Sequence, residues 1–154
     1  MPSVPFATKD VPGLVHFFAG RAAGTSAIPD FPLASQVKAL EAGLPQTELT
    51  DLQDSLALTN DRLVSLVGLS KSTFHRYKNT STNLDPLVSD RVVRFALLLS
   101  KAIKVFGGQE DAKKWLMSPQ FGLGGEIPLD YAKTEVGARE VENLLGRVEY
   151  GVYA

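Results

Sequence analysis

The chain contains no cysteine, and its 154 residues include two histidines, His16 and His75, that lie far apart in the sequence. The absence of thiols excludes disulfide frameworks, thiolate zinc sites and cysteine nucleophiles. No histidine cluster, carboxylate pair or nucleophile–base pair has a spacing typical of catalysis, and we expect Glu126 and Asp130 to be helix-surface acids. We therefore expect no metal, no cofactor and no catalytic residue, which argues against an enzyme.

Long hydrophobic runs are also missing. The longest uninterrupted apolar run is Phe95–Leu99, whereas a membrane-spanning helix needs about 20 apolar residues. The N-terminus has no basic region followed by a long apolar one, so a secretory signal is not expected. The sequence predicts a globular protein of a bacterial-type cytoplasm, without a membrane as partner.

Charge is distributed unevenly behind a net value of −1. Residues 62–104 carry eight basic and two acidic side chains, while the segments on both sides are net acidic. A basic middle between acidic flanks indicates a local anion-binding surface, for which nucleic acid is the obvious ligand. Chance variation in the charge of solvated helix faces is the alternative that charge alone leaves open.

Apolar residues recur at three- and four-residue steps, and no segment alternates as a strand would, so the fold class predicted is all-α. Helix-capping residues and glycines give the boundaries. We expect a helix from Asp30 to Gly43 with Leu33, Val37 and Leu40 as its apolar face, a helix beginning near Thr47 or Thr50, a short helix capped by Thr59, a long helix from Asp85-Pro86 to Phe106 ending at Gly107-Gly108, a short helix over Gln109–Leu116, and a last helix over Glu135–Glu149. Thr50 with Gln53 fits a capping box.

Residues 1–32 are rich in proline and glycine but contain several phenylalanines, which need a surface to cover. The segment is interpreted as an irregular arm. It either packs on its own domain or helps to form a dimer.

Residues 60–79 fit a helix-turn-helix. Gly68 stands at the ninth position, where the turn requires a left-handed backbone conformation. The positions at which the two helices contact each other and a third helix are all apolar or aromatic. They are Leu63, Val67, Leu69, Phe74 and Tyr77.

The second helix of this motif is expected to present a DNA-reading face. At about 100° per residue, Ser72, His75, Arg76 and Asn79 lie opposite the buried side chains, and Lys71 and Lys78 flank them. Arginine binds guanine and asparagine binds adenine, while serine, lysine and a helix N-terminus hold phosphate. The predicted DNA-binding residues are Ser70, Lys71, Ser72, His75, Arg76, Lys78 and Asn79. A purely structural helical hairpin would need the same inner residues. It would not need the charge pattern from Arg62 to Lys78, which has four basic residues and no acidic one.

The last third of the chain resembles the toxin-binding domain of Xre/MbcA/ParS-type antitoxins, and the resemblance extends back through the helix-turn-helix to about Gly43. The residues that carry it are Asp111 to Leu116, Ser118-Pro119, Leu123 to Leu129, Thr134 to Glu142 and Leu144 to Tyr153. The resemblance implies a type II antitoxin of a RES-Xre toxin–antitoxin system. Such a protein neutralises a RES-domain toxin that consumes NAD, and it represses its own operon. The NAD chemistry then belongs to the toxin.

Together with this resemblance, the aromatic C-terminal tail is interpreted as a plug for the toxin's substrate cleft, its terminal carboxylate meeting cationic groups. A frayed or self-packed terminus is the alternative. The predicted toxin-binding residues are Arg139, Arg147, Tyr150, Gly151, Val152, Tyr153 and Ala154, with the charged ones facing solvent.

Three units are expected: an arm and first helix over residues 1–43, a helix-turn-helix domain over 44–106, and a toxin-binding domain over 107–154. Because one helix-turn-helix rarely binds DNA tightly enough, a homodimer is expected on operator DNA, with residues 1–43 as its contact. A plain transcriptional regulator whose C-terminal domain only dimerises is the competing interpretation.

Overall fold

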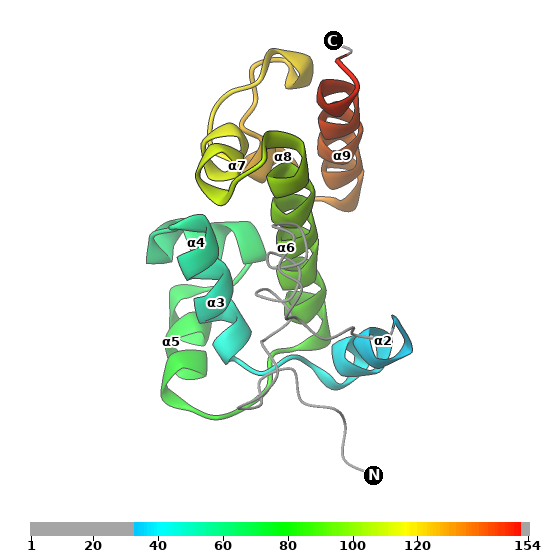
Figure 1. Ribbon diagram of the computed structural model, residues 1–154. Coiled ribbons are helices and arrows are strands. Elements are labelled where there is room, and N and C mark those ends of the chain that lie inside the picture. The colour runs from blue at the N-terminus through cyan, green and yellow to red at the C-terminus, as the bar shows by residue number, and fades with distance from the viewer. Residues whose placement is uncertain (1–32, 152–154) are drawn as a thin grey trace.

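The computed structural model describes residues 33–151, and all the regular structure in that range is helical (Figure 1). The all-α prediction is therefore confirmed. The helices are α2 (Leu33–Ala42), α3 (Thr47–Leu56), α4 (Asn60–Val67), α5 (Lys71–Asn79), α6 (Pro86–Phe106), α7 (Gln109–Leu116), the 3₁₀ turn η1 (Phe121–Leu123), α8 (Pro128–Tyr131) and α9 (Glu135–Glu149).

The long helix α6 is the centre of the fold. Asp85 caps it by accepting a hydrogen bond from the Leu87 amide at 2.9 Å, Pro86 occupies its first turn, and it ends before the left-handed Gly107. Its inward-facing side chains, such as Phe95 and Leu99, are fully buried and join a single core that continues into both halves of the chain. Helices α2, α3 and α4 pack against α6, and so do α7 and α9.

Helix α3 begins at the earlier of its two predicted starts, Thr47 and Thr50. It begins at Thr47 after Gln46, so Thr50 lies inside the helix and the predicted capping box with Gln53 is wrong. The extra turn places Leu49 in the core, where it is almost completely buried. Burial of this side chain outweighs the local preference of threonine for a helix start.

Helix α2 covers less of the core than its sequence predicts. Val37 is 46% exposed, Leu40 is partly buried, and Ala39 is the buried residue on the described part of this helix. The helix ends before Gly43 as expected, but Asp30, the predicted cap, lies outside the described residues.

Polar contacts join the helix-turn-helix to the last third of the chain. The guanidinium of Arg62 on α4 forms an ion pair with Asp130 on α8, and the Lys133 ammonium donates to the Ser65 hydroxyl at 2.9 Å. Between α3 and α7, the side-chain amide of Gln109 donates to the Ser55 backbone carbonyl at 2.9 Å. Asp130 is therefore not the surface acid that the sequence suggested, since it is half-buried and paired.

Within the part of the chain that the structure covers, no helix is long and apolar enough to cross a membrane. The same residues contain no group of three or more acidic or histidine side chains arranged to hold a metal ion.

Candidate functional site

Helices α4 and α5 form the predicted helix-turn-helix. Gly68 ends α4 with φ of 71°, in the left-handed region that a side chain rarely adopts. Thr59 caps α4 by accepting from the Arg62 amide at 3.2 Å, and Ser70 caps α5 by accepting from the Thr73 amide at 3.1 Å. The inner positions Leu63, Val67, Phe74 and Tyr77 are buried, and Leu69 is partly buried. The motif predicted from the sequence is confirmed.

Two hydrogen bonds fix this motif to α6. The Tyr77 hydroxyl accepts from the Asp85 amide at 3.1 Å, at the start of α6. The Arg91 guanidinium donates to the Val67 carbonyl at 3.1 Å, directly beside the turn at Gly68. The turn and the C-terminal part of the motif are therefore held, and α5 has a defined orientation on the scaffold.

The outward face of α5 carries the residues that the sequence predicted for it. All seven of the candidate side chains are exposed: Ser70, Lys71, Ser72, His75, Arg76, Lys78 and Asn79. The Lys78 ammonium lies 5.0 Å from the centre of the Phe74 ring, and the Arg76 guanidinium lies 5.5 Å from that of Tyr77. These contacts position cations along the face without neutralising them.

Several polar residues in this region have additional partners. Lys71 is 3.3 Å from Asp61 in an exposed ion pair, which is a weak interaction in water. The Ser70 hydroxyl, which caps α5 by accepting from the Thr73 backbone N–H, also donates to the Thr73 hydroxyl at 2.9 Å and lies 3.2 Å from the Ser72 hydroxyl. Arg62, which contributes to the basic count of the motif, is paired with Asp130.

The last third of the chain adds its apolar residues to the same core. Leu123, Pro128 and Leu129 are buried, and Trp115 is partly buried with its ring centre 5.6 Å from that of Phe106 on α6. Gly124 and Gly125 both have positive φ and form a turn.

Helix α9 leads to the predicted tail. Thr134 caps it by accepting from the Gly137 amide at 3.1 Å, and Tyr150 follows its last residue with 81% of its surface exposed. Gly151 is exposed as well. The other predicted tail residues, Val152, Tyr153 and Ala154, lie outside the described residues.

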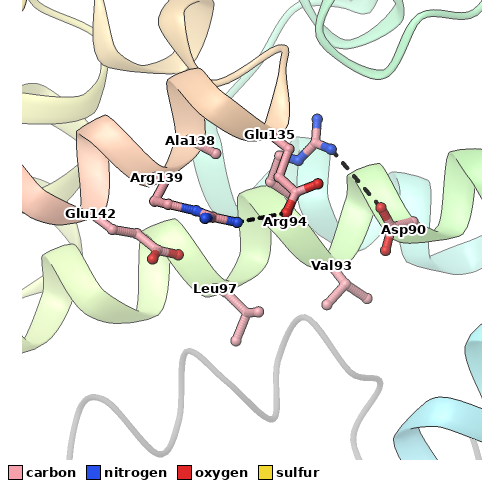
Figure 2. A pocket seen from close by; sticks show the side chains of 8 residues that line it. All are labelled: Asp90, Val93, Arg94, Leu97, Glu135, Ala138, Arg139 and Glu142. Atoms are coloured by element: carbon pink, nitrogen blue, oxygen red, sulfur yellow. Dashed lines mark hydrogen bonds and ion pairs between the residues drawn. The ribbon is translucent and has the colours of Figure 1, made fainter.

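The two predicted arginines lie on α9, before the tail. Arg139 is exposed and pairs with Glu135 at 2.9 Å, at the rim of a groove between α6 and α9 that Val93, Leu97 and Ala138 also line (Figure 2). It lies eleven residues before Tyr150, about 16 Å along the helix. Arg147 was expected to face solvent but is half-buried, and its Nε is buried with no hydrogen-bond partner among the described residues.

An exposed aromatic residue was missed in the sequence. Phe121, the first residue of η1, is 88% exposed. Phenylalanine is usually buried, so the residue type alone predicts that Phe121 lies in the core. The glycines that follow it are the one sequence signal that a turn carries it.

Comparison with known proteins agrees with both halves of this arrangement. Residues 35–97 match the family model of the antitoxin Xre-like helix-turn-helix domain, and residues 101–151 match that of the antitoxin Xre/MbcA/ParS C-terminal toxin-binding domain. The change between the two matched ranges falls inside α6, the helix that both halves share.

Curated relatives carry the same family name. The chain is similar to "Antitoxin Xre" of Yersinia enterocolitica, with 29% identity over 140 residues, covering 79% of this chain and 95% of the relative. It is 30% identical over 114 residues to "Antitoxin Xre" of Photorhabdus laumondii, covering 73% of this chain and 77% of the relative. The chain therefore belongs to the Xre family of antitoxins, proteins that combine a helix-turn-helix domain with a toxin-binding domain and are not enzymes.

Proposed function

We propose that this antitoxin neutralises a RES-domain toxin that consumes NAD, and that it represses its own operon through α5. The observation that carries the proposal is the separation of two exposed surfaces on one rigid scaffold. The outward face of α5 and the C-terminal end of α9 lie toward opposite ends of the molecule (Figure 1). One chain has room for operator DNA and a toxin at the same time.

The DNA half of the proposal rests on the chemistry of α5. Arg76 reads a guanine edge and Asn79 an adenine edge, while Lys71, Ser72 and Lys78 contact phosphates, and His75 touches the backbone. Replacing Arg76 by alanine lowers operator affinity by about 1–3 kcal/mol if it reads a base. Arg139→Ala, which removes an exposed arginine from the other half of the chain, is the matched control in a fluorescence-anisotropy titration. If Arg76→Ala binds the operator with wild-type affinity, Arg76 does not read a base and another residue makes that contact.

The toxin half rests on the exposed residues after α9. Tyr150 offers a large ring with a polar hydroxyl, a combination that suits an interface pocket. The tail from Tyr150 to Ala154 occupies the toxin's substrate cleft and blocks NAD from entering. Deleting these five residues therefore leaves toxin activity in the complex, measured as NAD loss. Full inhibition by the truncated chain would refute the plug.

The homodimer is formed by residues 1–43. Val37 on α2 is an exposed apolar side chain available for this contact. Two copies of α5 then reach half-sites about 34 Å apart, or a multiple of that distance. Val37→Glu raises the dimer dissociation constant in sedimentation equilibrium, and an unchanged constant would exclude α2 from the contact.

Co-purification separates this proposal from a plain transcriptional regulator. The chain is expressed together with the protein encoded beside its gene. An antitoxin forms a complex with that neighbour and suppresses its NAD loss, whereas a plain regulator purifies alone and leaves the neighbour active.

A further inference from the structure

The 3₁₀ turn η1 presents Phe121 to solvent on an unusually well-bonded loop. A single exposed apolar side chain carries no argument by itself. Here the preceding residue, Gln120, organises the turn. Its amide nitrogen donates to the carbonyls of Trp115 at 3.0 Å and Ser118 at 3.1 Å, and its backbone N–H donates to the Glu126 carbonyl at 3.0 Å.

The other side of the turn is bonded as well. The Gln120 carbonyl accepts from the Gly125 amide at 2.9 Å, and the Phe121 carbonyl accepts from the Gly124 amide at 3.0 Å. Gly124 and Gly125 have φ of 67° and 86°, which allows the chain to close this loop. The backbone that carries Phe121 is therefore fixed.

Tight packing attaches the turn to α9. A Cβ atom on Gly122 would lie 2.7 Å from Cδ1 of Leu144, so glycine allows η1 to lie directly on this leucine. Leu144 precedes Tyr150 by six residues, about 9 Å along the helix. Figure 1 shows the loop that contains η1 at the same end of the molecule as the last turn of α9. Phe121 and Tyr150 are thus two exposed aromatic residues on elements at the same end of the molecule.

We propose that Phe121 is an apolar anchor of the toxin-binding surface and fills an apolar pocket on the toxin outside the substrate cleft. The inference rests on the proposed function, because that function makes the toxin the partner of the end of the molecule that carries η1 and the end of α9. A rigid aromatic side chain loses little conformational entropy on binding, and such residues dominate interface energetics. The tail then supplies inhibition, and Phe121 supplies affinity.

The toxin is the occupant that the comparisons favour for this turn. Residues 101–151 match the family model of the toxin-binding domain, and η1 lies within that range. Helix α5, which we assign to operator DNA, lies toward the other end of the molecule (Figure 1).

The test compares three variants of the full chain with the toxin encoded beside its gene: Phe121→Ala, Leu87→Ala and deletion of Tyr150 to Ala154. Leu87 on α6 is the control, since it is 70% exposed and near the opposite end of α6. Because Phe121 is also exposed, its removal should leave the thermal melting curve unchanged. Calorimetry gives the dissociation constant, and residual NAD loss at saturating antitoxin gives the completeness of inhibition.

Phe121→Ala is expected to weaken toxin binding about tenfold or more while saturating amounts still inhibit fully. Leu87→Ala is expected to match the wild type. If wild-type chain binds toxin but Phe121→Ala changes the constant less than twofold, the anchor is refuted while the proposed function stands. The anchor is equally refuted if Phe121→Ala instead shifts the oligomeric state of the chain alone. If wild-type chain does not bind the toxin, the proposed function fails first.

Discussion

Gly137 and Gly146 lie on the same helix, α9, in surroundings that predict opposite effects of one added methyl group. A Cβ atom on Gly137 would lie 1.7 Å from the backbone carbonyl oxygen of Tyr131, at the end of α8. A Cβ atom on Gly146 has no atom within 4 Å outside the helix's own backbone. Gly137 therefore allows α9 to pack closely against the end of α8, whereas Gly146 has free space beside it.

The expected magnitudes follow from these distances. Replacing glycine by alanine inside a helix stabilises it by about 0.5–1 kcal/mol at both sites. At Gly137 the clash is with backbone, so α8 and α9 must separate, and overpacking of this kind costs about 1–3 kcal/mol or more. Gly137→Ala is therefore expected to lower the free energy of unfolding by about 1–2 kcal/mol. Gly146→Ala is expected to raise it by up to about 1 kcal/mol.

Urea denaturation followed by circular dichroism measures both changes. In thermal melts, a change of 1 kcal/mol corresponds to about 2–4 °C for a chain of this size. Gly137→Ala should also bind toxin more weakly and keep its operator affinity, since α9 lies far from α5 (Figure 1). Equal stability of the two variants, or a Gly137→Ala chain more stable than the wild type, would refute the packing account of α9.

Two further predictions concern the contacts that hold the helix-turn-helix in place. Ser70→Ala removes the cap of α5 and should destabilise the chain by about 1 kcal/mol in denaturant unfolding. His75→Ala, at an exposed position of the same helix, should change stability by less than about 0.5 kcal/mol. Equal effects would contradict the capping role. The Arg62–Asp130 pair, with about a third of each side chain exposed, should give a coupling energy near 1 kcal/mol in a double-mutant cycle with alanine; additive single effects would show that the pair does not stabilise the contact between α4 and α8.

The parts of the fold that the sequence predicts are those determined by residues close to each other in the chain. Asp85-Pro86 and Gly107 fix the ends of α6, and Gly68 fixes the turn of the motif, because each specifies backbone geometry within a few residues. The exposed face of α5 follows from helical period once Phe74 and Tyr77 are assigned to the core.

The features that sequence reasoning missed depend on contacts between distant residues. Arg62 and Asp130 are separated by 68 positions, and nothing near either residue signals the pair. Helix α3 begins early because Leu49 is buried against the core, which local capping preference does not reveal. Phe121 is exposed because Gln120 and Gly122 fix its turn against α9, so its role depends on tertiary packing.

The central claim is that two separate surfaces of one scaffold bind two different macromolecules. Its most direct test measures operator affinity and toxin inhibition for Arg76→Ala and for the chain lacking Tyr150 to Ala154, in the same preparations. The account predicts that Arg76→Ala loses operator affinity and still inhibits the toxin fully, while the truncated chain binds the operator normally and leaves the toxin active. Loss of both activities in either folded variant would contradict it.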